Sequence, residues 1–217
     1  MDHGREPCEA RGALSQSFTS VVRSRRMTRS FDTRPVAAEI LHDIVSLAAR
    51  APSAGKTQGW HLVVLEGHDT SQFWDITLPA ERRATFRWQG LLRAPVIALA
   101  FADPQAYVQR YAEPDKRRSG LGEGVDAWGT PYWTVDAAMA LNTLLLAAED
   151  VGLGALFFAV FSGEAELRSA LHVPAELQLL GALALGWPDQ PRSERGDGLS
   201  ATRARRSAAE IIHRGGW

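Results

Sequence analysis

Cysteine is almost absent from this chain, and its scarcity excludes two kinds of architecture. Cys8 is the only cysteine among 217 residues, and it lies in a polar N-terminal stretch. Without a second cysteine the chain can build neither an internal disulfide framework nor a cysteine-based zinc site. We therefore expect a cytoplasmic protein.

Long apolar runs and a sizeable net charge are also lacking. No uninterrupted apolar run reaches about 18 residues, the length that favours a membrane-spanning helix. The first 16 residues carry Asp2, Glu6 and Glu9 and lack the apolar stretch of a secretory signal. The formal net charge is -1, too small to attract nucleic acid non-specifically. We predict neither a membrane nor a nucleic-acid partner.

The composition that remains is typical of one folded domain. The chain is 45% hydrophobic and 23% charged, so enough apolar surface is present to offset the entropy lost on folding. No internal repeat and no linker divides it. We predict a flexible N-terminal tail over residues 1–14 and a single domain over residues 15–217.

Apolar residues at three- and four-residue spacing predict five helical regions. Pro35, Thr134 and Ser162 are expected at helix starts, and Ala51-Pro52 is expected to end the second helix. The region after Thr134 has a broad apolar face with small residues, which predicts a central helix. The five regions are residues 18–26, 35–51, 69–92 with a break at Pro79, 134–151 and 162–171.

Short, uncharged or β-branched runs predict four strands, at residues 60–65, 96–102, 155–161 and 177–187. The first and third of these runs are apolar enough to be expected in buried positions. Helices and strands alternate with irregular spacing, which predicts an α+β fold rather than a doubly wound parallel sheet.

Familiar catalytic and nucleotide-binding motifs are missing. The sequence contains no GxGxxG after a strand, no P-loop, no GxSxG elbow and no HExxH or CxxC. We predict no metal site and name no catalytic side chain. A redox cofactor that brings its own reactivity would need only binding and orientation from such a protein.

The positive charge is almost entirely arginine, since Lys56 and Lys116 are the only lysines. The rigid guanidinium fork fits phosphate and carboxylate oxygens. Arg25, Arg26 and Arg29 cluster after the first predicted helix, and a second cluster holds Arg203 and Arg205 at a spacing of two. From charge alone, these clusters could bind one phosphate together or could be ordinary solvated patches.

Five segments then resemble, in order, the FMN-dependent nitroreductase family. They are RRMTRSF (25–31), LAARAPSAGKTQGWHLVVL (47–65), DAAMALNTLLLAAEDVGLGALFFAVF (136–161), LGALALGWPD (180–189) and RARRSAAEII (203–212). Each motif is weak or moderate alone, but the ordered set covers residues 18–217. The resemblance favours the phosphate-binding interpretation of the arginines.

The resemblance implies FMN as the cofactor, NADH or NADPH as the electron donor, and a set of flavin-binding residues. The first arginine cluster would hold the phosphate, the ribityl chain and the pyrimidine edge of the ring. Arg29 is the candidate for the charge that stabilises the anionic reduced flavin. A second loop would reach the flavin of the partner subunit, a strand segment would lie beside flavin N5, and the terminal arginines would complete the phosphate clamp. In that order the residues are Arg25, Arg26, Met27 and Arg29; Pro52, Ser53, Ala54 and Lys56; Ala159 and Val160; and Arg203 and Arg205.

Two departures from the family pattern affect these contacts. Met27 stands where serine is usual and cannot donate a hydroxyl proton to a phosphate. Lys56 stands where asparagine is usual, and an ammonium donates but does not accept hydrogen bonds. We expect Arg25 and the terminal arginines to compensate for the first departure, and the flavin potential to reflect the second.

The implied architecture is a mixed central sheet surrounded by helices in an intertwined homodimer, with two FMN molecules at the interface. The implied reaction is ping-pong: NAD(P)H reduces the flavin at N5, and a nitroaromatic, quinone or similar electrophile then takes its place. Residues 111–133, rich in glycine, proline and charge, could be a lid over a ligand or a disordered connection. Within them Trp128, Tyr132 and Trp133 could stack on the substrate or serve in packing.

Several alternatives remain open at this stage. The same fold could support flavin fragmentation to dimethylbenzimidazole or reductive dehalogenation. The protein could also bind flavin for storage or sensing without turnover. Nucleic-acid binding through the arginines is a third alternative, which the near-neutral net charge disfavours.

Overall fold

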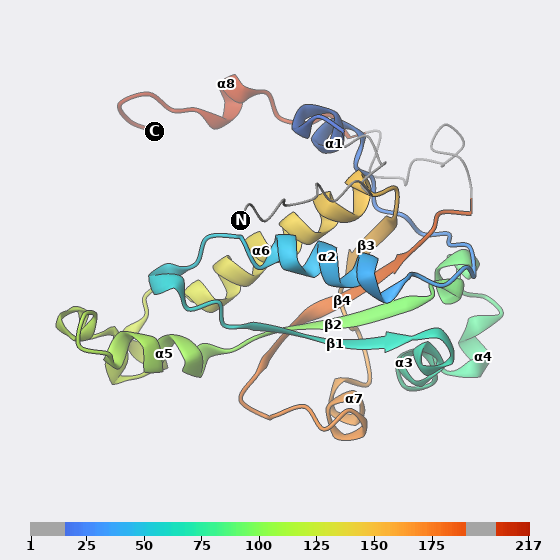
Figure 1. The fold of residues 1–217 in the computed structure, drawn as a ribbon, viewed down its shortest axis with the longest axis horizontal. Coiled ribbons are helices and arrows are strands. Elements are labelled where there is room, and N and C mark those ends of the chain that lie inside the picture. The colour runs from blue at the N-terminus through green and yellow to red at the C-terminus, as the bar shows by residue number, and fades with distance from the viewer. Residues whose placement is uncertain (1–15, 190–202) are drawn as a thin grey trace, which may run out of the picture.

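The computed structural model describes residues 16–189 and 203–217, which form a sheet enclosed by helices (Figure 1). The predicted tail lies outside the described residues. Four strands form one antiparallel sheet in the order β1-β2-β4-β3, and this confirms the predicted α+β class. Within the described residues one parallel pairing makes the sheet mixed. It is an isolated bridge between Met27 and Ala155. The strands are β1 (Trp60–Glu66), β2 (Val96–Ala102), β3 (Gly154–Phe158) and β4 (Gln178–Gly186).

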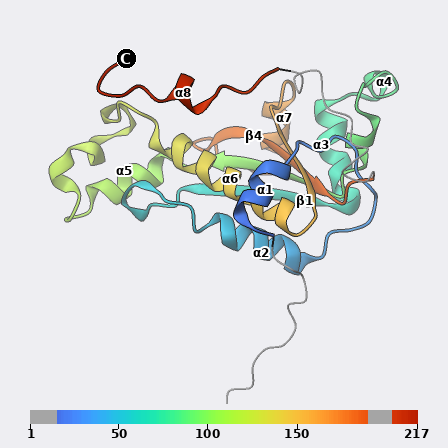
Figure 2. The same cartoon turned by 90° about the horizontal axis from the view of Figure 1, so that it is seen from above.

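Helices cover both faces of the sheet (Figures 1 and 2). Helices α2 and α6 pack against each other on one face, and α3 and α7 lie on the other. The α-helices are α1 (Phe18–Ser24), α2 (Ala38–Ala48), α3 (Thr70–Thr77), α4 (Ala80–Arg83), α5 (Pro104–Ala112), α6 (Tyr132–Asp150), α7 (Glu164–Ala170) and α8 (Ala208–Ile211). None of the helices in the described ranges is long and apolar enough to cross a membrane.

The alternation of side chains along β2 explains why the sheet has a core on each side. Val96, Ala98 and Ala100 face the α2 and α6 side, whereas Ile97 and Leu99 face the α3 and α7 side. All seven residues of β2 are buried, as expected for a central strand covered twice. The central position predicted for the long helix α6 is confirmed by its ten buried residues.

Three predicted helix starts are wrong by a few residues. Helix α2 begins at Ala38, so Pro35 precedes the first helical turn. Helix α6 begins at Tyr132 after Pro131, so Thr134 lies inside the helix and donates instead to Gln178 Oε1. Helix α7 follows Gly163. The hydroxyl of Ser162 is engaged elsewhere, as a donor to the Thr77 carbonyl.

Two strand predictions also need correction. Strand β1 is an edge strand and only partly buried: Leu65 is buried, His61 and Glu66 are exposed, and its other residues are intermediate. Strand β3 ends at Phe158 rather than at residue 161. Phe158 pairs with Ala182 in the last pair between β3 and β4; the adjacent Gly181 has a φ of 149°, and the register of β4 against β2 shifts beside it. Ala159 therefore has no strand partner in register.

Residues 111–133 form an ordered series of short 3-10 turns after α5, which excludes the disordered alternative. The turns are η4 (Arg117–Ser119), η5 (Leu121–Glu123) and η6 (Val125–Ala127). Trp128 closes the series by donating from Nε1 to the Leu121 carbonyl over 2.9 Å. The glycine-rich segment GLGEG, residues 120–124, lies within these turns.

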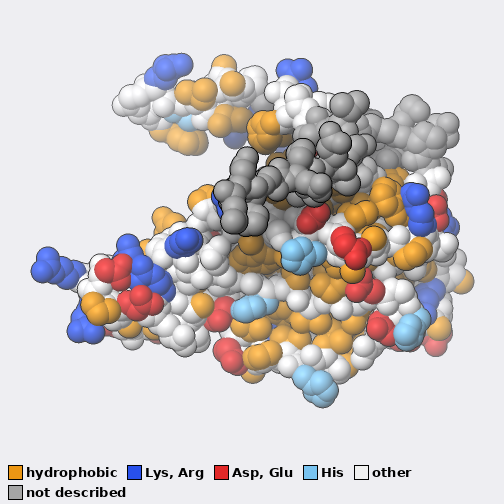
Figure 3. All heavy atoms as spheres, viewed as in Figure 1, with side chains coloured by type: hydrophobic (Ala, Val, Ile, Leu, Met, Phe, Trp, Pro, Cys, Tyr) orange, Lys and Arg blue, Asp and Glu red, His pale blue; other side chains and the backbone are white. Residues whose placement is uncertain are grey.

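The C-terminal arm, residues 203–217, extends away from the rest of the chain (Figures 1 and 2). It carries α8, whose start has a capping box made by Ser207 and Glu210. Every residue of the arm is exposed, including Ile211 and Ile212 at 59% and 52% and a fully exposed Trp217. Figure 3 shows basic and hydrophobic side chains side by side on it.

Candidate functional site

The first arginine cluster lies in an extended segment, residues 25–29, that follows α1 and runs beside the free edge of β3. Met27 forms a parallel bridge with Ala155, and the Thr28 amide donates to the Ala155 carbonyl over 2.9 Å. The approach is close: a Cβ at Gly154 would lie 2.7 Å from the Thr28 side chain. Backbone pairing with an edge strand therefore fixes where the arginines emerge. We call residues 25–29 the arginine segment.

Arg25 is half-buried and electrostatically strained. Burial, followed by the positive charges of Arg205 and Arg26, lowers the pKa of Arg25. Its Nη1 atom is buried and has no hydrogen-bond partner among the described residues. A guanidinium stays charged at neutral pH, so this position holds a cation with an unused donor beside a second cation. Such an arrangement is suited to an anion.

The charge of the second arginine cluster acts on the first, although the two clusters lie at opposite ends of the chain. Arg205 is close enough to act on the pKa of Arg25. Arg203 is exposed on the same extended stretch that precedes α8. The next arginine, Arg206, is turned toward its own arm, where it donates to the Glu210 carbonyl.

The other members of the arginine segment have different surroundings. Arg26 donates from Nη1 to the carbonyls of Arg23 and Arg25, at 2.8 and 3.1 Å, and so satisfies the end of α1. The Arg29 guanidinium lies over the ring of Trp88, 5.1 Å from its centroid. Met27, which replaces the family's serine, packs against both cores of the sheet. Its side chain therefore has a structural role in place of a hydroxyl donor.

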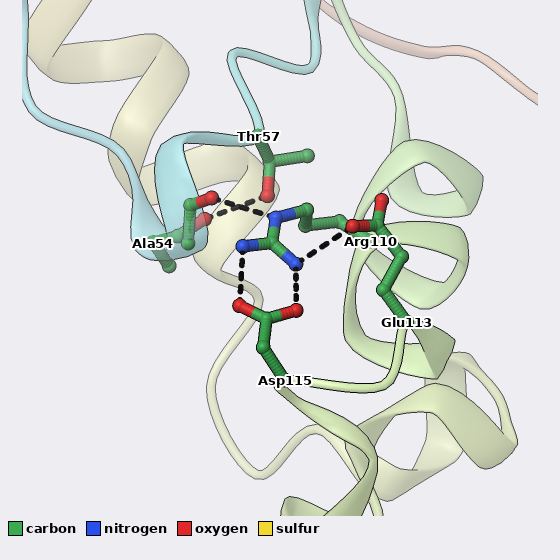
Figure 4. Close-up of polar contacts among 6 residues, drawn as sticks. Ala54, Thr57, Arg110, Glu113 and Asp115 are labelled. Carbon is green, nitrogen blue, oxygen red and sulfur yellow. Dashed lines mark hydrogen bonds and ion pairs between the residues drawn. The ribbon is translucent and has the colours of Figure 1, made fainter.

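The 53–57 turn, which holds Ser53, Ala54 and Lys56, follows α2 and the exposed Pro52. Its conformation is unusual because Gly55 and Lys56 both have positive φ, 62° and 56°. The Ala54 amide donates to the buried carboxylate of Asp136 over 2.7 Å. The Gly55 carbonyl accepts from Arg110 Nε over 2.9 Å (Figure 4).

Ala159 and Val160 lie just beyond the end of β3. Ala159 is exposed, and Val160 packs against the core on the α3 side. Ala155, which meets the arginine segment, is four residues earlier on the same strand. At about 3.3 Å per residue the two places are about 13 Å apart along one edge of the sheet.

The three candidate aromatic residues are placed unequally. Trp128 and Trp133 are 9% and 7% exposed and pack edge-on against Tyr107, with centroids 5.7 and 6.4 Å away. This is the packing role that the sequence left open for them. Tyr132 is 44% exposed and its ring lies 6.1 Å from that of Trp128. Among the three, Tyr132 offers a free ring surface.

Sequence reasoning missed Asp136 and Arg110, the two residues that hold the 53–57 turn. Asp136 is 3% exposed and accepts a second hydrogen bond from the Tyr107 hydroxyl over 2.7 Å. Its spacing from Trp133 and Ala140 places it on the buried face of α6, and a charge on that face was a usable signal. Arg110 carried no such signal, because the sequence of a short helix does not show that its arginine donates to a distant backbone carbonyl.

Comparison with known proteins places this chain in a family. The family model described as the nitroreductase family matches residues 22–187. The chain belongs to the nitroreductase family. A relative from Rhodospirillum rubrum, 5,6-dimethylbenzimidazole synthase, is 30% identical over 76% of this chain and 78% of its own length. The 4-nitrobenzoate reductase of a Nocardioides species is 28% identical over 80% of this chain and 81% of its own.

The fold agrees with solved nitroreductase structures. A nitroreductase-type protein from Exiguobacterium sibiricum, crystallised in complex with FMN, superposes with a TM-score of 0.71 at 17% identity. The match covers 91% of this chain and 97% of that one. Membership of the nitroreductase family supports an oxidoreductase enzyme. Among the described residues, no group of three or more metal-binding side chains comes together.

Proposed function

We propose that this chain is an FMN-dependent oxidoreductase that takes electrons from NADH or NADPH and passes them to a nitroaromatic, quinone or similar electrophile. The observation that carries the proposal is the unpartnered, buried Nη1 donor of Arg25 beside the charge of Arg205. A phosphate monoester would accept from that donor and would offset the repulsion between the two guanidinium groups. The residues present therefore fit the phosphate end of FMN.

The remaining family contacts follow the same edge of the sheet. With the phosphate at Arg25, Arg203 and Arg205, the ring would lie toward Ala159 and Val160, about 13 Å along the strand direction. Arg26 would add positive charge at the phosphate, and Met27 would contribute only backbone. Arg29, supported by Trp88, would provide the cation at the pyrimidine edge. When bound, FMN would supply the electron transfer itself, in two half-reactions of a ping-pong cycle.

The position of the 53–57 turn supports a homodimer. Ala54 is held by Asp136 near the start of α6, whereas Gln16, just before α1, donates to Asp150 at its end. These two points of α6 are about 21 Å apart at 1.5 Å per residue. Met27 of the arginine segment pairs with Ala155, just beyond that end of α6, so the turn and the arginine segment of one chain do not meet. We propose that Pro52, Ser53, Ala54 and Lys56 complete the flavin site of a partner subunit.

The exposed apolar side chains supply a surface for that partner. Phe18 and Val22 of α1 and Leu47 of α2 are 74%, 47% and 52% exposed. The arm adds Ile211, Ile212 and Trp217, which are also exposed. We propose that the arm packs on the partner and that burial of these side chains stabilises the dimer.

The substrate would lie over the outer face of the flavin ring. Tyr132 is the proposed stacking residue, with Trp128 and Trp133 behind it as a rigid support. We assign no side chain to proton transfer, because the reactive atom belongs to the cofactor. The chain's own contribution is to bind, orient and exclude water.

Anaerobic reduction of the purified protein tests the proposal. We expect yellow protein with one FMN per chain, bleached by NADH or NADPH and recoloured by a nitroaromatic or a quinone. Yellow protein that neither nicotinamide reduces would favour a non-catalytic flavin carrier. Protein that stays colourless after incubation with FMN would overturn the proposal.

Flavin fragmentation is a second candidate, favoured by the 30% identity to 5,6-dimethylbenzimidazole synthase. The two activities differ in the fate of the flavin. A nitroreductase returns FMN unchanged, whereas a fragmenting enzyme consumes reduced FMN in oxygen and releases dimethylbenzimidazole. Chromatography of the flavin before and after aerobic turnover distinguishes them.

A further inference from the structure

The 53–57 turn is held from two sides by residues outside it. On one side the Ala54 amide donates to Asp136 Oδ2, and on the other Arg110 Nε donates to the Gly55 carbonyl, at 2.7 and 2.9 Å. Figure 4 shows the Arg110 guanidinium between this turn and the acidic residues that follow α5. Two consecutive residues of the turn are thus fixed through their backbone.

The turn needs such support because its backbone conformation is unfavourable. Lys56 and Gln58 have φ of 56°, a value that side chains with a Cβ rarely adopt. Gly55 has a φ of 62°, and a Cβ there would lie 3.0 Å from the Tyr111 ring. Conformations of this kind persist where surrounding contacts impose them.

The Arg110 side chain is held firmly enough to impose such a conformation on the turn. Its Nη1 and Nη2 atoms bind the two oxygens of Asp115 at 2.7 and 2.8 Å, and Nη1 also lies 3.0 Å from Glu113 Oε2. The hydrogen bonds to Asp115 raise the pKa of Arg110, and Arg110 in turn lowers the pKa of Asp115. Only a guanidinium can donate from both terminal nitrogens to one carboxylate while its Nε donates to a third acceptor.

Asp136 is held just as firmly on the other side. It is buried, and the hydroxyl of Tyr107 donates to the same oxygen that receives the Ala54 amide. Burial and this hydrogen bond raise the pKa of Tyr107. The phenol therefore remains a donor throughout the physiological range.

We propose that Arg110 and Asp136 are positioning residues that hold Lys56 against the flavin of the partner subunit, and that the Arg110–Asp115 pair thereby sets the affinity and reduction potential of that flavin. The inference rests on the proposed function. Lys56 is exposed in a single chain, so the turn's backbone, rather than side-chain packing, decides where its ammonium lies. A cation held near the ring favours the reduced anion and raises the potential.

Substitutions at Arg110 test the proposal in the full-length holoprotein. Arg110→Gln removes the charge and the fork, and Arg110→Lys keeps the charge but cannot bridge Asp115 and Gly55. We expect both to weaken FMN binding about tenfold, the effect of losing one charge-assisted hydrogen bond. The potential should become more negative in both. Arg118→Gln, an exposed arginine of the η4 turn, is the matched control and should match the wild type.

The two readouts separate a positioning role from a general loss of folding. FMN affinity is measured by quenching of flavin fluorescence, and the potential by equilibration with a reference dye. Amide hydrogen exchange of residues 54–57 in the flavin-free protein gives an independent measure, expected to rise in Arg110→Gln and Asp136→Asn. If Arg110→Lys retains wild-type affinity, potential and exchange, the proposal is wrong.

The outcomes also distinguish this inference from the proposed function. Wild-type protein that takes up no FMN overturns the function and the claim about potential together. Wild-type protein that binds FMN, with Arg110 and Asp136 variants that bind it equally well at the same potential, overturns only the positioning role.

Discussion

The arginine segment and the 53–57 turn are both expected to contact flavin, yet the fold treats them in opposite ways. Arg25 in the segment is left with a buried, unpartnered donor and a repelling neighbour in Arg205. In the turn, Ala54 and Gly55 have their backbone groups satisfied by Asp136 and Arg110. One region is electrostatically incomplete, and the other is complete and rigid.

This difference indicates a division of tasks. A charged group that lacks a partner costs stability in the free protein and can return that free energy when an anion binds. A turn that is already fixed loses little entropy when a ring is placed against it. Affinity for the phosphate should therefore depend on the segment, and the properties of the ring on the turn.

The largest expected effect is at Arg25. We expect Arg25→Met to weaken FMN binding about 100-fold, since a charge-assisted hydrogen bond worth up to about 3 kcal/mol is lost. The same change should leave the flavin-free protein as stable as before or more stable, because a half-buried, repelled cation is removed. Flavin titration and thermal unfolding of the flavin-free protein measure the two effects.

Arg26→Met is the matched comparison for Arg25. Arg26 already donates from Nη1 to the carbonyls at the end of α1. We expect a loss of about 1 kcal/mol in unfolding free energy and a loss of FMN affinity below about tenfold. Equal affinity losses at both positions would show that the unpartnered donor has no special role.

Substitution of Arg205 should have a smaller effect on FMN affinity, and the size of that effect should depend on whether Arg25 is present. We expect Arg205→Met to weaken FMN binding about tenfold in the wild type. In the Arg25→Met background the loss should be smaller, because the repulsion that phosphate relieves is already gone. Fully additive losses in the double-mutant cycle would argue against a shared phosphate.

The fold was largely predictable from sequence because its signals are local. The apolar run of residues 96–102 could be assigned as a strand without any knowledge of its neighbours. The end of β3 could not, because it depends on where its pairing with another strand, β4, stops. Helix starts were missed where a residue suited to a helix start has another place in the fold. Pro35 precedes the first turn of α2, and Ser162 donates to the Thr77 carbonyl.

The candidate site was predictable only in part. The grouping of Arg25 with Arg205 came from the ordered motifs, since no spacing rule relates residues so far apart in the sequence. Asp136 was detectable as a carboxylate on an apolar helix face, whereas the bond from Arg110 to Gly55 leaves no trace in composition or periodicity. Contacts between a side chain and a distant backbone carbonyl require the folded geometry.

The support beneath the turn gives a prediction with a defined pH dependence. Tyr107→Phe leaves Asp136 with one donor fewer and should cost about 1 to 2 kcal/mol of unfolding free energy at pH 7. Because the pKa of Tyr107 is raised in the folded protein from 10.0, the unfolded chain ionises first as the pH increases. The wild-type advantage should be complete below pH 10 and fall by about 1.4 kcal/mol per unit above it.

Denaturant unfolding of both proteins at several pH values measures this difference. The Tyr107→Phe variant lacks the titrating group, so its unfolding free energy at each pH is the reference that removes all other effects of alkaline pH. A difference between the two proteins that stays constant from pH 9 to 11 would contradict the hydrogen bond between Tyr107 and Asp136.

The smallest expected effect concerns Lys56 itself. Asparagine tolerates positive φ better than lysine, so Lys56→Asn should raise the unfolding free energy by about 0.5 kcal/mol. The phosphate contacts are unchanged, and FMN affinity should fall by no more than the about tenfold expected for Arg110→Gln. The reduction potential should nevertheless become more negative, because the cation beside the ring is lost. An affinity loss as large as that of Arg25→Met would remove the distinction between a segment that binds the phosphate and a turn that tunes the ring.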